Sequence, residues 1–106
     1  MARTPSQRFE ASITRDNLWI YILTLLRRKE LYAYELNSRI LDTFGFSPGN
    51  VTAYIVLQRL KTGGYVRASR TAKEGGPSRH YYGVTPMGLA ELKKARAIIG
   101  KYSEVL

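Results

Sequence analysis

Residues 47–86, SPGNVTAYIVLQRLKTGGYVRASRTAKEGGPSRHYYGVTP, decide the fold of this chain. Ser47-Pro48 places a capping hydroxyl before a proline, and this pair favours the start of a helix. The apolar spacing that follows predicts a helix to about Thr62, and Gly63-Gly64 then ends it.

A β-hairpin and a last helix are predicted to follow. Residues 65–70 and 79–85 alternate between apolar and polar side chains, and residues 71–78 between them are rich in turn formers. Thr85-Pro86 repeats the pairing of a capping hydroxyl with a proline, so it predicts a helix to about Glu104.

Two further helices are predicted on the N-terminal side. One runs from Asp16, as its cap, to Arg28, and the other from Ala33 to Phe44, where Gly45 supplies a positive-φ stop. Residues 1–15 show little periodicity, so we expect them to form a mobile, mildly basic arm.

This order of elements predicts a mainly α fold with a small β-hairpin (α+β). Three short helices followed by a hairpin are the layout of a winged helix-turn-helix, which we assign to residues 16–85. Residues 86–106 would then form a C-terminal dimerisation helix. In such a domain the third helix enters the major groove of DNA, and the hairpin, or wing, grips the backbone.

Composition supports a polyanionic partner. Seventeen Lys and Arg against eight Asp and Glu give the 106-residue chain a net charge of +9. With no cysteine and a single histidine, a disulfide framework and a Cys-based or His-rich metal site are excluded. The longest apolar run, Leu18 to Leu26, is too short to span a bilayer, and the first residues lack a secretory signal. We expect a cytoplasmic protein with no membrane partner and no cofactor.

The outward face of the third helix is the predicted reading surface. It carries no carboxylate, although an ordinary solvated face, the alternative interpretation, usually carries some. Gln58 and Arg59 can bond base edges or phosphate, Thr52 and Tyr54 can donate to phosphate, and Ile55 can meet a thymine methyl. The predicted contacts of this helix are Asn50, Thr52, Tyr54, Ile55, Gln58 and Arg59.

The hairpin adds a second group of predicted DNA contacts. These are Arg70, Lys73, Ser78 and Arg79. A charge run of this kind can also be a solvated face, but here it lies on the wing that the fold would offer to DNA. The single histidine, His80, is expected to be a partly packed strand residue rather than a metal ligand.

A dimer seam is predicted from the last helix. Its apolar residues recur at the 3-4-3-4 spacing of a short coiled coil. A helix folded back on its own domain is the alternative. Trp19 belongs to a second apolar stripe on the helix of residues 16–28, which is either central in the domain or faces another subunit. The predicted interface residues are Trp19, Leu92, Ala95, Ile99, Tyr102 and Leu106.

Three blocks carry a resemblance to a known family: residues 18–36 (LWIYILTLLRRKELYAYEL), 51–66 (VTAYIVLQRLKTGGYV) and 78–92 (SRHYYGVTPMGLAEL). They resemble the PadR-type transcriptional regulators, in the short branch with one C-terminal helix. The resemblance implies a homodimeric DNA-binding regulator, commonly a repressor. Some members respond to a small molecule, and nothing in this sequence names one. The most specific residues are Thr52, Tyr54, Leu57, Arg59, Leu60, Gly64, Tyr81, Tyr82, Thr85 and Gly88.

The function predicted from the sequence is that of a dimeric, sequence-specific DNA-binding regulator of an inverted-repeat operator, and the resemblance implies that it acts as a repressor. Two alternatives stay open: a non-specific architectural DNA-binding protein, and a winged-helix module whose partner is another protein. An enzyme is not expected, because no triad order, carboxylate pair or phosphate-cradling loop stands out.

Overall fold

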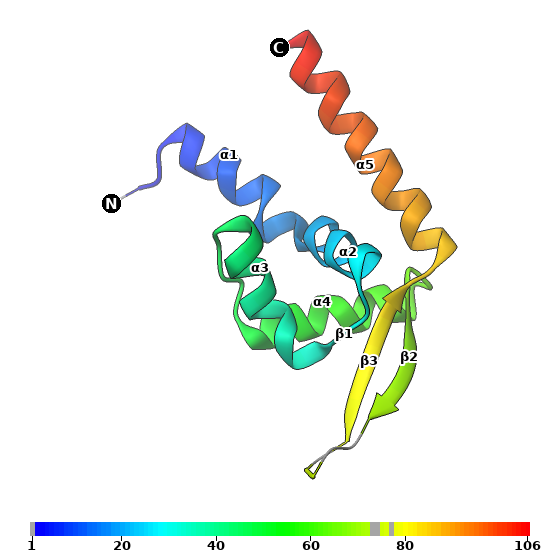
Figure 1. Ribbon diagram of the computed structural model, residues 1–106. Helices are drawn as coiled ribbons and strands as arrows, with labels where there is room; N and C mark the ends of the chain where they lie inside the picture. The colour runs from blue at the N-terminus through cyan, green and yellow to red at the C-terminus, as the bar shows by residue number, and fades with distance from the viewer. Residues whose placement is uncertain (1, 73–74, 77) are drawn as a thin grey trace.

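The computed structural model describes residues 2–72, 75–76 and 78–106. Figure 1 shows a helical body from which a β-hairpin projects at one end, while the first and last helices diverge at the other. The elements are α1 (Pro5–Ile13), the 3-10 turn η1 (Arg15–Asn17), α2 (Leu18–Arg28), β1 (Leu31–Tyr32), the 3-10 turn η2 (Ala33–Glu35), α3 (Leu36–Phe44), α4 (Asn50–Thr62), β2 (Val66–Ala72), β3 (Arg79–Val84) and α5 (Pro86–Val105).

The predicted hairpin is confirmed, and a third strand joins it. Within the described residues the antiparallel sheet has the order β1-β3-β2, with Leu31 opposite Tyr82 and Val66 opposite Val84. A bulge at Ser69 shifts the register of β2. The predicted order of three helices, hairpin and helix is therefore incomplete: it lacks β1, whose two residues are too few to show a period.

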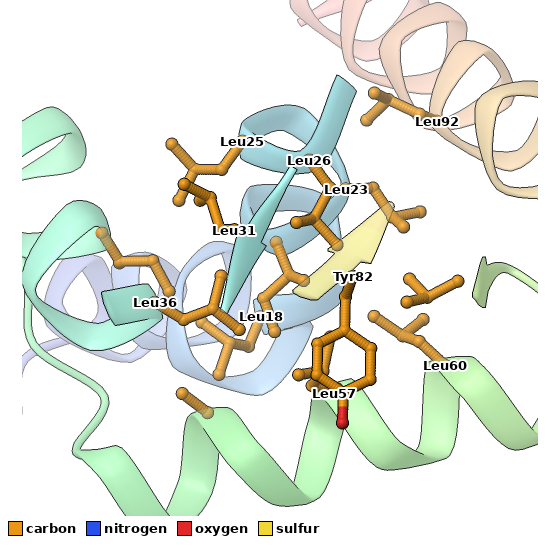
Figure 2. Close-up of a cluster of buried hydrophobic side chains, with 14 residues drawn as sticks. Leu18, Leu23, Leu25, Leu26, Leu31, Leu36, Leu57, Leu60, Tyr82 and Leu92 are labelled. Atoms are coloured by element: carbon orange, nitrogen blue, oxygen red, sulfur yellow. The ribbon is translucent and has the colours of Figure 1, made fainter. Parts of the chain in front are cut away.

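The core is built around α2, which contacts α3, α4, α5 and β3. Both of its apolar stripes are buried, so the prediction of a central helix is confirmed, and Trp19 packs half-buried against the core. Figure 2 shows the leucines of α2 meeting Leu57 and Leu60 of α4 and Leu92 of α5. Tyr82 reaches from β3 into the same cluster, with its hydroxyl directed toward α4.

The stretch predicted as a mobile arm, residues 1–15, contains a helix that was not predicted, because residues 5–13 form α1. A capping box begins this helix: the Gln7 amide donates to the Thr4 hydroxyl (3.2 Å), and the Thr4 amide donates to the Gln7 side chain (2.8 Å). Pro5 in the first turn adds to the start signal. Because α1 is short and leaves its apolar side chains exposed, its sequence shows little helical periodicity. Thr4 and Pro5 were the residues that could have predicted its start.

Two predicted helix starts are also corrected. Asp16 lies in η1, and α2 begins only at Leu18. The helix α4 begins at Asn50 rather than at Pro48, because the Ser47 hydroxyl and the Gly49 amide both donate to the Asn37 side-chain oxygen (3.1 and 2.8 Å) and hold this segment outside the helix. In this contact Ser47 donates its hydroxyl proton, and Gly49 has a non-helical backbone (φ 93°, ψ 147°), so helical geometry starts only after it. The stops at Gly45 and Gly63 lie where predicted.

The start of α5 is bonded to the turn between α4 and β2. The Thr85 hydroxyl accepts from the Gly88 amide (3.1 Å) and donates to the Gly64 carbonyl (2.6 Å), as the cap predicted from Thr85-Pro86 requires. Gly88 is buried directly against the Tyr65 carbonyl oxygen, and a Cβ at this position would overlap that oxygen and approach Val84 Cγ2 to 2.8 Å. Only a glycine lets α5 lie this close.

Two glycines on α5 test this close approach. We expect Gly88→Ala to destabilise the fold by at least about 2 kcal/mol through overpacking, with a melting temperature lower by roughly 10 °C. Gly100→Ala is the matched control. Open space surrounds Gly100, so the added helix propensity should stabilise by up to about 1 kcal/mol. Equal melting temperatures for the two variants would contradict the account.

Candidate nucleic-acid interface

The exposed face of α4 is the first component of the candidate interface. Its inward residues Ala53, Leu57 and Leu60 are buried, as the helical spacing predicted. On the outward face Tyr54 is 50% exposed and Ile55 is 44% exposed. The exposed residues of this face, none of them acidic, are Asn50, Val51, Thr52, Tyr54, Ile55, Arg59 and Thr62.

Gln58 is half-buried and tied to the sheet. Its side-chain amide nitrogen donates to the Tyr82 hydroxyl at 3.2 Å, although the two residues lie on different elements. This bond restrains the Gln58 side chain. It uses the amide nitrogen of Gln58 and not the amide oxygen. Tyr82 therefore positions the Gln58 side chain, a contact that the spacing within either segment does not predict.

A cleft of about 420 Å³ joins α4 to the wing. Tyr54 of α4 lies on one wall, and Ser78, Arg79 and His80 lie on another, so residues predicted on separate elements share one hollow. Among the described residues that line the cleft none is acidic, while phenol hydroxyls, a serine and a guanidinium are all possible donors to an anion. Sequence reasoning missed Tyr32, Ala33 and Tyr34, which complete the lining from β1 and η2.

The predicted wing residues have different surroundings. The Arg70 guanidinium lies 3.8 Å from the Tyr81 ring centre and 3.7 Å from a Glu30 oxygen, so it is held along the strand. Arg79 lies over the ring of Tyr32 at 4.9 Å and lines the cleft. Ser78 is exposed, and Lys73 lies outside the described residues.

The predicted dimer seam needs correction. Leu92 and Ala95 are 2% and 6% exposed, because the first half of α5 packs on α2 of the same chain. They are core residues, and the prediction that they face a partner is wrong. Trp19 packs on the core and lies beside Arg59 and Tyr65 rather than near the far end of α5. The 3-4 spacing marks an apolar stripe but does not say what covers it.

The second half of α5 is exposed and borders an apolar groove of about 690 Å³ between α1, α2 and α5. Ile99, Tyr102 and Leu106 are 57%, 52% and 99% exposed there. At its base the Tyr21 hydroxyl donates to the Ile13 carbonyl (2.5 Å), and burial raises the pKa of Tyr21. The apolar lining is Phe9, Ile13, Ile20, Tyr21, Phe44, Ile98, Ile99, Tyr102 and Leu106.

The described part of the chain contains neither a metal-binding cluster nor a membrane-spanning helix. No group of three or more His, Cys, Asp or Glu side chains is placed to hold a metal ion. The helices described are all too short or too polar to cross a membrane.

Comparison with known proteins decides the family. Residues 22–94, from α2 to the middle of α5, match the model of the transcriptional regulator PadR-like family. This chain belongs to that family. The resemblance and the winged-helix fold predicted from the sequence are thereby confirmed. The PadR-like family consists of transcriptional regulators rather than enzymes, in agreement with the sequence analysis.

Relatives of this PadR-like regulator include an uncharacterized protein of Lysinibacillus sphaericus, 30% identical over 90% of this chain and 86% of the relative. A PadR-family regulator of Eggerthella lenta has the same fold, with a TM-score of 0.80, 24% identity and coverage of 93% and 86% of the two chains. Bacillus subtilis PadR, solved in complex with operator DNA, has a TM-score of 0.64 at 31% identity, covering 73% of this chain and 45% of that one.

Proposed function

We propose that this PadR-like regulator is a dimeric, sequence-specific DNA-binding protein that acts in the cytoplasm as a repressor. One observation carries the proposal: the acid-free outward face of α4 and the wing meet in a donor-rich cleft on a chain of net charge +9. The structure of Bacillus subtilis PadR with operator DNA supports the same use of the fold.

In this proposal α4 enters the major groove. Gln58 and Arg59 contact base edges, Ile55 meets a thymine methyl, and Asn50 and Thr52 lie at the end of the helix nearest the backbone. The Tyr54 hydroxyl, at the cleft, donates to a phosphate, and the ring keeps the hydroxyl in place. From the wing, Lys73, Ser78 and Arg79 hold the neighbouring backbone.

A second copy of the chain covers the groove between α1 and α5. Its exposed apolar side chains, including Phe9 at 63%, line one groove. The diverging ends of α1 and α5 lie at the end of the molecule opposite the wing (Figure 1). A two-fold dimer of this kind would bind an inverted repeat.

Selection of bound sequences from random DNA tests the proposed reading. We expect the purified protein to recover an inverted repeat with half-sites about 10 bp apart and to prefer it to random DNA by at least about 10³-fold. Competition binding measures that ratio. Recovery of no common sequence would instead favour an architectural DNA-binding protein, and failure to bind any DNA at moderate salt would favour a protein partner.

The hydrogen bond between Gln58 and Tyr82 makes the next prediction. Tyr82→Phe keeps the buried ring and removes the hydroxyl, so Gln58 loses its restraint. A neutral hydrogen bond contributes about 0.5–1.5 kcal/mol, so we expect the operator-to-random affinity ratio to fall by about two- to tenfold. Gln58→Ala should lower the same ratio. Tyr81→Phe, on the opposite face of β3, is the control, and equal losses on both DNAs would assign Tyr82 to packing alone.

A charge in the groove tests the dimer. Ile99→Asp is expected to yield monomers in sedimentation, with operator binding weakened by at least about tenfold, because a carboxylate is costly to bury in an apolar seam. Ala97→Asp adds the same charge at an exposed position outside the groove lining and should stay dimeric. A dimeric Ile99→Asp variant would show that another surface forms the interface.

A further inference from the structure

The outer face of the sheet carries a linked cluster of charged and aromatic side chains. Because Leu31 and Tyr82 face the core, the alternation of strands turns their neighbours outward. The rings of Tyr32 and Tyr81 meet edge to face at 5.7 Å. Arg70 and Arg79 then lie over these two rings at the ends of the row.

Glu30 holds two arginines of this face. Its Oε2 lies 3.5 Å from Nη2 of Arg67, and its Oε1 lies 3.7 Å from Nε of Arg70. The strand leaves room for the first contact at Gly83, where a Cβ would come within 3.4 Å of both the Arg67 guanidinium and the Glu30 oxygen. Both guanidinium groups therefore lie beside the Glu30 carboxylate along the sheet while their side chains stay partly exposed.

The Glu30–Arg67 and Glu30–Arg70 ion pairs are exposed enough to affect DNA binding more than stability. The Arg67 and Arg70 side chains are each 55% exposed and Glu30 is 39% exposed, and solvated ion pairs add little to the free energy of folding. These ion pairs affect the binding of a polyanion more than they affect the free energy of folding. Every phosphate neutralised by a free cation contributes about −0.9 to the slope of log K against log salt, whereas a cation held by a carboxylate contributes less.

We propose that Glu30 limits the sequence-independent affinity for DNA by holding Arg67 and Arg70 along the outer face of the wing. This inference rests on the proposed DNA-binding function. Arg67 and Arg70 are restrained by Glu30 and therefore contact phosphates less. Arg79 contacts the DNA backbone directly, because among the described residues no carboxylate lies within salt-bridge distance of its guanidinium.

The test is Glu30→Gln, assayed on random DNA over a salt series. An arginine freed from Glu30 can make one further phosphate contact. The slope of log K against log salt should then become steeper by about 1, and binding should tighten about eightfold at 0.1 M salt. The melting temperature should be nearly unchanged. Glu91→Gln is the matched control, since Glu91 is 37% exposed and lies 3.6 Å from Lys94 on α5, away from the wing. It should change random-DNA affinity less than about twofold.

The arginines themselves complete the experiment. Adding Arg67→Ala and Arg70→Ala to the Glu30→Gln chain should remove the gain, while the same pair in the unaltered chain should flatten the salt slope less than Arg79→Ala does. No gain, an equal gain in Glu91→Gln, or a gain that survives loss of both arginines would overturn the inference. If the unaltered chain binds no DNA, the proposed function fails; if it binds and Glu30→Gln does not differ, only this inference fails.

Discussion

The burial of both apolar stripes of α2 is the constraint on which the remaining structure depends. A helix that is apolar on most of its circumference has to be covered on several sides, and here α3, α4, α5 and β3 provide the cover. Covering α2 turns Leu57 and Leu60 of α4 inward and leaves the opposite face of α4 to solvent. The geometry of the candidate DNA surface is thus set by the core behind it.

Tyr82 connects that core to the candidate interface. Its ring is buried among leucines (Figure 2), and its hydroxyl accepts from Gln58 at the edge of the exposed face. A change in the packing of β3 would therefore alter the orientation of a side chain proposed to contact bases. The wing and α4 form one candidate surface, because the cleft between them is lined by both and by β1.

Several local signals were overridden by contacts from distant residues. Ser47 and Pro48 favour a helix start, yet Ser47 and Gly49 both bond to Asn37, and the helix begins only at Asn50. Leu92 and Ala95 have coiled-coil spacing, yet α2 of the same chain covers them. Arg70 belongs to a basic run, yet Glu30 and Tyr81 hold it along the strand. In each case a nearby sequence pattern identified the residue's chemistry and not its partner.

The sequence by itself determined the winged-helix class, the order of the long helices, the hairpin and the side of α4 that faces outward. These features follow from periodicity, caps and glycine stops, which act within a few residues of the chain. Only the tertiary structure decided the third strand, the Gln58–Tyr82 bond, the shared cleft, the ion pairs of Glu30 and the boundary on α5 between core and exposed surface. Each of these joins residues far apart in the chain, and the spacing of one segment carries no information about which other segment will cover it.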